Sequence, residues 1–149
     1  MKKINLTIIL AAITSFSFSQ DPVDWNFTFK KTGEKTGELR LVASVNKPWH
    51  MFSQWQPKDA IASPTVIEIS KNPLLIVNGK FTESGDKETY KNTQLGVSAF
   101  QYQGKVIFVQ PVILRSKIKT SISGSVTFQV CNEEQCLPPK TISFKVGIP

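Results

Sequence analysis

Apolar and polar residues alternate with a period of two along most of the chain, which is the pattern of half-buried β-strands. In the first such stretch, Trp25–Lys30, the residues Trp25, Phe27 and Phe29 share one face. In the second, Glu38–Val45, every other residue is again apolar. The further candidate strands are Thr65–Ser70, Leu74–Val77, Val97–Tyr102, Lys105–Leu114, Gly124–Val130 and Thr141–Val146.

Residues that favour turns separate these stretches. The segment GEKTG at 33–37 and the dipeptide Asn78-Gly79 predict turns. A further turn is predicted at Gln103-Gly104, between two strands, and Pro111 in the second of them predicts a sheet edge or a bulge. The polar stretch Thr82–Gln94 carries no apolar periodicity and predicts a long exposed loop.

About seven to nine short strands without a helical stripe predict an all-β protein, most simply an antiparallel β-sandwich. Such a sheet pair buries one face of each strand and exposes the other. The chain has 149 residues, of which 40% are hydrophobic, and this suits one compact domain. We therefore expect a single domain over residues 20–149, following a short leader.

The first 19 residues have the features of a secretory signal peptide. Lys2 and Lys3 precede the mostly apolar run Ile4–Thr14, which is shorter than the roughly 20 residues of a membrane span. Ser17 and Ser19 then form a small-x-small pattern that predicts cleavage before Gln20. An uncleaved anchor is the alternative. Export to a bacterial periplasm, with no membrane insertion after cleavage, is the prediction, and that compartment lets disulfides persist.

The formal net charge of +7 falls to +5 when Lys2 and Lys3 leave with the signal. The remaining lysines are scattered and form no dense basic block. Nucleic-acid binding is therefore not expected, and the charge favours at most acidic partners.

Chemistry is concentrated in the segment QVCNEEQCLPPK, residues 129–140, which holds both cysteines. A metal site is short of ligands, because structural zinc wants about four N or S donors and the chain has two cysteines and one histidine. Copper held by the two thiols with His50 and Met51 is the remaining metal alternative. No metal and no other cofactor is expected.

A structural disulfide is the second interpretation of the pair. Candidate strands flank it, and a bridge across a short loop fits disulfide geometry. Closing a loop of about six residues nevertheless removes only about 2 kcal/mol of unfolded-chain entropy in the simple model. A sandwich of this size does not need that contribution to fold.

A redox-active disulfide is the third interpretation. A bond confined to a local loop can open while the sheets stay folded, and an exposed loop lets another thiolate reach a sulfur. Pro138 and Pro139 would stiffen the chain after Cys136. Glu133 and Glu134 act in the opposite direction, because negative charge disfavours thiolate formation. The residues alone leave the structural and redox interpretations equally open.

The segment GSVTFQVCNEEQCLPPKTISFKV resembles the end of the N-terminal periplasmic domain of the thiol:disulfide interchange protein family DsbD, where a cysteine pair lies in a strand-loop-strand before Pro-Pro. Two other stretches agree. NKPWHMFSQ, Asn46–Gln54, is similar to the family's aromatic-rich segment, and VNGKFTESGDKETY, Val77–Tyr90, is similar to the turn and loop that cap its active site. The resemblance covers Asp24–Val146.

The resemblance implies an immunoglobulin-like sandwich that receives electrons from a membrane-embedded carrier and passes them to periplasmic thioredoxin-like proteins, with cytochrome c biogenesis among the processes served. Cys136 would form mixed disulfides and Cys131 would resolve them. Tyr90, with Glu88 beside it, would shield the pair, and His50 and Phe52 match positions that face it. No small-molecule substrate is implied.

Two departures from the family accompany the resemblance. The cysteine spacing is one residue shorter than in enterobacterial members. The family's transmembrane and thioredoxin-like domains have no counterpart before Pro149, so we expect a stand-alone unit whose electron source is another chain.

A passive immunoglobulin-like binding module with a structural disulfide is the competing function. In that case His50 is an ordinary histidine at the edge of the core. The three tryptophans are most simply packing residues. No Ser-His-Asp constellation and no glycine-rich phosphate loop is readable.

Overall fold

The computed structural model describes residues 21–60, 62–117 and 119–149. The predicted signal peptide, residues 1–19, and its cleavage site at Ser19-Gln20 lie outside the described residues. Among those residues there is no helix with the length and apolar character to span a membrane.

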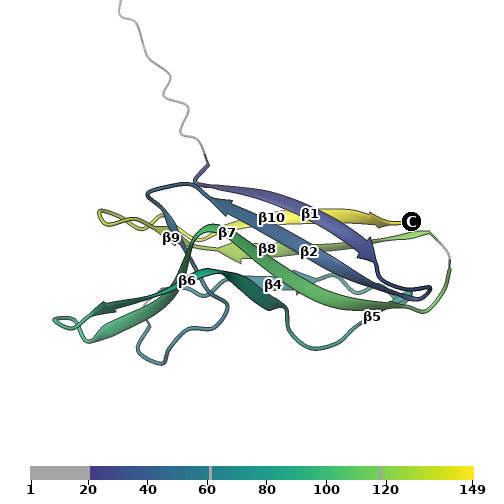
Figure 1. The fold of residues 1–149 in the computed structure, drawn as a ribbon, viewed down its shortest axis with the longest axis horizontal. Coiled ribbons are helices and arrows are strands. Elements are labelled where there is room, and N and C mark those ends of the chain that lie inside the picture. The colour runs from purple at the N-terminus through teal and green to yellow at the C-terminus, as the bar shows by residue number, and fades with distance from the viewer. Residues whose placement is uncertain (1–20, 61, 118) are drawn as a thin grey trace, which may run out of the picture.

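The described residues form ten strands in two antiparallel sheets and no helix (Figure 1). The larger, seven-stranded sheet has the order β1-β2-β7-β3-β9, and β5 and β6 also pair with β7. The smaller sheet has the order β10-β8-β4. The strands are β1 (Val23–Lys31), β2 (Thr36–Val45), β3 (His50–Phe52), β4 (Val66–Ile69), β5 (Leu75–Val77), β6 (Thr82–Asn92), β7 (Val97–Leu114), β8 (Thr120–Phe128), β9 (Val130–Cys131) and β10 (Lys140–Ile148). The predicted all-β, immunoglobulin-like antiparallel β-sandwich is confirmed.

The core between the sheets follows the predicted alternation. Every apolar residue at the odd positions of β2, from Leu39 to Val45, is buried. On β1 the ring of Trp25 stacks on Phe27, with centroids 5.9 Å apart, and meets Phe128 of the smaller sheet at 5.3 Å. Offset and tilted aromatic pairs of this kind add to the burial of apolar area, so these rings help to join the two layers.

The predicted turn at Gln103-Gly104 is wrong, because β7 runs unbroken through it. Gly104 has a φ of 62° and lies in a β-bulge, where the register with β6 shifts between Gly85 and Asp86. The bulge adds residues to β7 and bends it without ending it. At this bend β7 exchanges one neighbour for another, since β2 pairs from Gly104 onward and β3 pairs with Gln101 and Tyr102.

The predicted loop over Thr82–Gln94 is also wrong, because most of it is β6. Nearly all of its side chains are exposed or half-buried, so the stretch lacks the apolar alternation of a core strand. It is held instead by backbone pairing with β7. The hairpin formed by the end of β6 and the start of β7 projects beyond the two layers (Figure 1).

Pro111 lies where one edge of β7 is open. It pairs with Glu38 of β2 on one side, while on the other side β6 reaches Val109 and β5 reaches Val112. Pro111 therefore lies in the gap between the ends of β6 and β5, in agreement with the predicted edge position.

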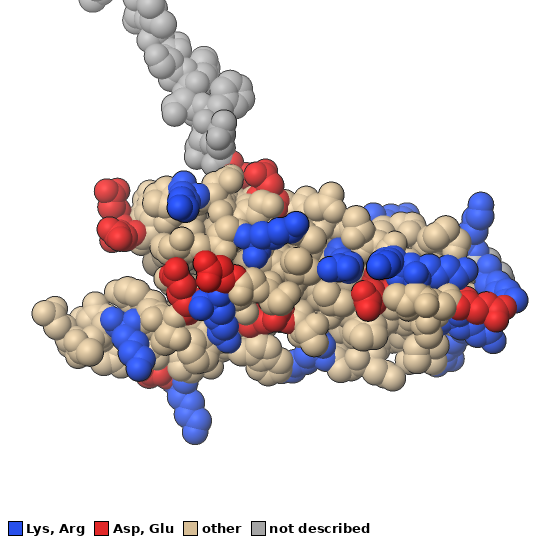
Figure 2. Space-filling view, viewed as in Figure 1, with Lys and Arg blue, Asp and Glu red and all other residues tan. Residues whose placement is uncertain are grey.

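Basic and acidic side chains are interspersed on the face seen in Figure 2. On the right half of that face the basic side chains gather in a row with a few acidic groups beside it, whereas tan areas separate the basic side chains on the left half.

Candidate functional site

The cysteine segment lies where the chain crosses from one sheet to the other. β8 belongs to the smaller sheet, and β9, one residue later, pairs with β3 in the larger sheet. The predicted single strand Gly124–Val130 is therefore divided at Gln129. The Gln129 carbonyl accepts a hydrogen bond from Phe52 N at 3.4 Å, and its side chain donates to Leu137 O at 3.1 Å. These bonds anchor the crossing point on both sides.

Cys131 and Cys136 form a disulfide across a tight hairpin, with their Cα atoms 4.0 Å apart. Leu137 N donates to Val130 O at 2.9 Å, and Asn132 N donates to Gln135 O at 2.9 Å. The cysteines thus face each other at the non-hydrogen-bonded position between two bonded pairs, where antiparallel strands approach closest. We call residues 130–137 the cysteine hairpin.

The tip of the cysteine hairpin is held by its own polar groups. Asn132 Oδ1 accepts hydrogen bonds from Glu134 N at 2.9 Å and from Gln135 N at 2.8 Å. An asparagine that bonds the backbone two and three residues ahead stabilises a turn. The hairpin therefore has four hydrogen bonds that do not depend on the sulfur–sulfur bond.

The two cysteines differ in exposure. Cys136 is exposed, and Cys131 is half-buried. The neighbours Glu133, Glu134 and Gln135 are exposed as well. A second protein can therefore approach the pair from the Cys136 side.

A cavity of about 540 Å³ lies beside the disulfide, and we call it the cysteine groove. Its walls come from β3, β6, β7 and the cysteine hairpin. All six residues singled out from the sequence line it: Cys131, Cys136, His50, Phe52, Glu88 and Tyr90. The structure thus brings the predicted set together.

The cysteine groove lies on the outer face of the larger sheet. Successive residues of a strand point to opposite faces. Met51 and Val130 are buried in the core between the sheets, so their neighbours His50 and Cys131, which line the groove, point outward. Met51 and His50 lie on opposite faces of β3, so their side chains do not point toward a common metal position.

His50 of β3 pairs directly with Cys131 of β9. Its Nε2 lies 3.7 Å from Glu88 Oε2 and contacts the side-chain amide of Gln103. The imidazole is thus held between β9 on one side and a carboxylate on the other. This arrangement fixes the ring at the floor of the groove.

The two aromatic residues have different surroundings. Phe52 is 5% exposed and forms part of the floor. Tyr90 is 48% exposed and stands on the projecting β6–β7 hairpin, where Asn92 Nδ2 donates to its hydroxyl at 3.5 Å. The segment compared with the family's cap loop is therefore a strand here, and Tyr90 is a wall residue with one side in solvent.

Ala99, Gln101 and Gln103 also line the groove and were not predicted. They occupy alternate positions of β7, the strand that was read as two strands with a turn. Alternation along the predicted strand Val97–Tyr102 places Ala99 and Gln101 on one face, but only the pairing of β6 with β7 brings that face beside Glu88 and Tyr90.

No protein-family model matches the chain, and no curated protein matches it. Among solved structures, the complex between the DsbD N-terminal and PilB N-terminal domains from Neisseria meningitidis contains a chain that matches with a TM-score of 0.52 and 13% identity, over 83% of this chain and 80% of that chain. The fold is therefore similar to that of the DsbD N-terminal domain. The reduced DsbD N-terminal domain of the same organism matches with a TM-score of 0.48 and 16% identity, over 81% and 82% of the two chains. At these identities the likeness to DsbD is one of fold.

Proposed function

We propose that the chain is an exported thiol–disulfide exchange domain of the DsbD N-terminal type. The observation that carries the proposal is a disulfide on an exposed hairpin whose backbone hydrogen bonds do not require it. Such a bond can open and close while the sandwich stays folded, as a redox couple must. The shared fold and the resemblance of the cysteine segment add support.

Cys136 is the exchanging sulfur in this proposal, and Cys131 is the resolving one. The Cys136 thiolate attacks one sulfur of a partner disulfide, and the partner's other sulfur leaves as a thiolate. The Cys131 thiolate then attacks Cys136 Sγ, which releases the partner's first sulfur and re-forms the intramolecular disulfide. Two electrons pass to the partner, and its thiolates take up protons from solution. The exposure of Cys136 and the partial burial of Cys131 support this order.

The partners in the proposal are a membrane-embedded dithiol carrier, which reduces the pair, and periplasmic thioredoxin-like proteins, which oxidise it. Residues 1–19 act as the signal peptide that brings the domain to the periplasm. His50, Phe52, Glu88 and Tyr90 surround the pair and limit the access of small oxidants and reductants. Their positions around one cavity support this shielding role.

The proposal is tested by trapping mixed disulfides. In Cys131→Ala the exchanging sulfur remains and the resolving one is absent, so mixed disulfides with a thioredoxin-like protein should accumulate. Cys136→Ala is the matched control and should accumulate few. Non-reducing gels of the two variants, incubated with the oxidised partner, give the measurement. Trapping through Cys131 alone would reverse the assignment.

Thiol labelling of protein taken from cells separates the proposal from a passive binding module. A pair that is partly reduced in cells, or that a thioredoxin-like protein reduces readily, supports exchange. A pair that stays oxidised in millimolar reductant until the fold melts identifies a structural disulfide and rules exchange out.

A further inference from the structure

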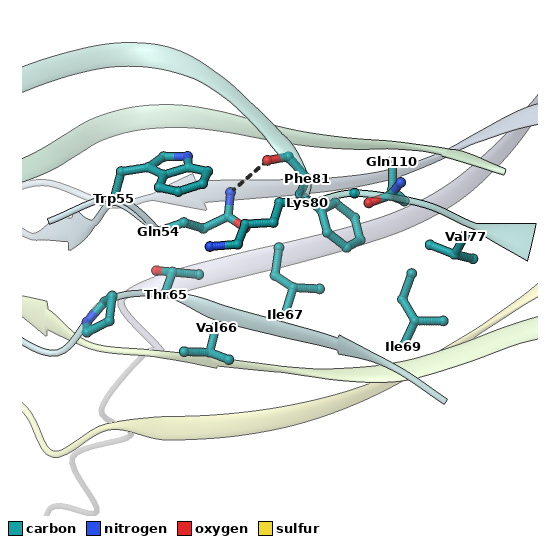
Figure 3. A pocket seen from close by; sticks show the side chains of 12 residues that line it. Gln54, Trp55, Thr65, Val66, Ile67, Ile69, Val77, Lys80, Phe81 and Gln110 are labelled. Atoms are coloured by element: carbon teal, nitrogen blue, oxygen red, sulfur yellow. Dashed lines mark hydrogen bonds between the residues drawn. The ribbon is translucent and has the colours of Figure 1, made fainter. Parts of the chain in front are cut away.

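A second cavity, of about 290 Å³, opens at the edge of the sandwich between β4 and the segment that joins β5 to β6 (Figure 3). We call it the β4 cavity. None of its lining residues lines the cysteine groove. Ile67 and Ile69 point into it from β4, toward Phe81 of that segment and Gln110 of β7 (Figure 3). It is therefore a separate feature of the molecule.

Gln110 brings an unpaired acceptor to the β4 cavity. The residue is 1% exposed, and its Nε2 donates to Asn78 O at 2.9 Å and to Pro111 O at 3.1 Å. These two carbonyls fix the orientation of the amide, because turning it over would bring its oxygen against both of them. Oε1 is left without a hydrogen-bond partner. Buried acceptors are rarely left unpaired in folded proteins.

The surroundings of Gln110 Oε1 do not favour a lone water. Ile67, Ile69, Val77 and Phe81 form much of the lining. A buried water typically makes about three hydrogen bonds, and these side chains offer none. The polar lining residues Gln54 and Thr65 already donate to Phe81 O and Phe52 O. The arrangement suits an apolar group that carries one donor at its end.

The outer edge of β4 is open beside the same cavity. Ser70 N donates to Ser123 O of β8 at 2.8 Å. By the alternation of an antiparallel ladder, the backbone groups of Glu68 and Val66 also face β8, and those of Ile67 and Ile69 face away. Within the described ranges, β4 is the last strand of its sheet and has β8 as its sole strand neighbour. Ile67 and Ile69 thus combine a free backbone edge with side chains that line the cavity.

We propose that β4 binds an extended segment of another protein, which adds to the smaller sheet as a fourth strand and inserts a tyrosine into the β4 cavity. A residue that pairs with Ile67 or Ile69 points to the same face as they do, into the cavity. About 300 Å³ is the lower limit of small-molecule pockets, so this volume suits one large side chain. The hydroxyl at the end of a tyrosine ring supplies the donor for Gln110 Oε1.

The mouth of the β4 cavity fits a peptide of this kind. Trp55 is 46% exposed there, and Lys80 Nζ lies 4.4 Å from the centre of its ring. Exposed tryptophans with an apolar face and a polar tip are common at protein interfaces. The pair gives the partner an aromatic surface beside the free strand edge.

The test uses two pools of random octapeptides, one with tyrosine and one with phenylalanine fixed at the fourth position. Peptides selected on the full chain are measured singly by titration, and their site is mapped by amide chemical-shift changes. We expect binders from the tyrosine pool, with shifts at Ile67 and Ile69. Replacing their tyrosine by phenylalanine should weaken binding about tenfold, because Oε1 is again left unpaired.

Two variants test separately how the free edge of β4 and the β4 cavity contribute to peptide binding. Gln110→Met removes the acceptor and should abolish the preference for the tyrosine peptide over the phenylalanine peptide. Ile67→Pro removes a backbone donor from the free edge and should weaken the binding of both peptides. Glu68→Gln, whose backbone faces β8, is the control and should bind as the wild type does. The proposal is overturned if neither pool gives a binder, if phenylalanine binds as well as tyrosine, or if the shifts lie away from β4. Mapping on the wild type decides the matter even where a variant fails to fold.

Discussion

Glu83 on β6 joins the segments that carry the cysteine groove. Its carboxylate accepts hydrogen bonds from the hydroxyl of Ser53, from Gln54 N at 2.9 Å and from Gln54 Nε2 at 3.3 Å. Ser53 is fully buried and directly follows β3. The carboxylate therefore holds the end of β3, and with it Phe52, against the start of β6.

Replacing Glu83 by glutamine should destabilise the protein by about 1–3 kcal/mol, because the new amide puts a donor among groups that already donate. Urea unfolding gives the measurement. Glu68→Gln changes a carboxylate that is exposed on β4 and should cost less than about 0.5 kcal/mol. Equal effects in the two variants would mean that the Glu83 contacts contribute nothing specific.

Tyr102 should make stability fall at high pH. Burial, and then the charge and hydrogen bond of Glu83, raise the pKa of Tyr102 well above its ordinary value of about 10. The pKa of Tyr102 is higher in the folded than in the unfolded state. The neutral phenol therefore contributes its full stabilisation below about pH 10, and this contribution is lost as pH rises beyond that value. Above that pH the free energy of unfolding should drop by up to about 1.4 kcal/mol per pH unit more than in Tyr102→Phe. Urea unfolding across about pH 9 to 11 measures this difference, and parallel curves would contradict it. Tyr90→Phe, at an exposed tyrosine, is the control.

The strands that bury a face were predictable from the sequence. In β1 and β2 the alternation of apolar residues directly reports the core face, as the buried positions from Leu39 to Val45 illustrate. β6 has no such signal, because its side chains project into solvent on both faces for most of its length. A strand fixed by backbone pairing to a neighbour leaves little trace in its own residues.

The cysteine groove could be predicted only in part, because some of its walls come from stretches without a clear strand signal. The cysteines and His50 belong to recognisable segments. Gln103 was missed because the predicted turn at Gln103-Gly104 is in fact a bulge, in which Gly104 has a φ of 62°. Gln101 was missed because β6, which places Glu88 opposite it, was predicted as a loop. The division of β8 from β9 at Gln129 was missed as well. Apolar residues occupy every other position from Val126 to Val130. This pattern does not reveal that the stretch is divided between two sheets, with β8 in the smaller and β9 in the larger.

Gly124 is required where β8 meets β4. A Cβ atom there would lie 2.1 Å from the backbone oxygen of Glu68 and 2.8 Å from the ring of Phe144. Gly124→Ala should therefore force β4 and β8 apart and cost about 1–3 kcal/mol. Gly147→Ala in the neighbouring β10 is the matched control, since its Cβ would meet nothing within 4 Å. Thermal unfolding compares them, and equal midpoints would contradict the crowding.

For the molecule as a whole, the sandwich and the cysteine hairpin are largely independent in stability. The core consists of apolar side chains between the sheets, and neither cysteine belongs to it. The loop closed by the disulfide spans a sequence separation of 5, which is among the least stabilising lengths. The redox state of the pair should thus have little influence on the fold.

Reduction of the disulfide should lower the free energy of unfolding by about 2 kcal/mol and leave the sheets intact. The melting temperature should fall by less than about 10 °C. Circular dichroism of the oxidised protein and the reduced, alkylated protein gives the comparison. A reduced protein that is unfolded at room temperature would contradict the proposed exchange function as well.

The closeness of the two cysteines also bears on when their disulfide can form in a newly made chain. Their hairpin is complete by Leu137, whereas β10, which finishes the smaller sheet, begins at Lys140. A short hairpin forms within about 10 μs, far faster than a ribosome adds a residue. The disulfide can therefore form before the last strand docks, and with two cysteines in the sequence there is a single intramolecular pairing to form.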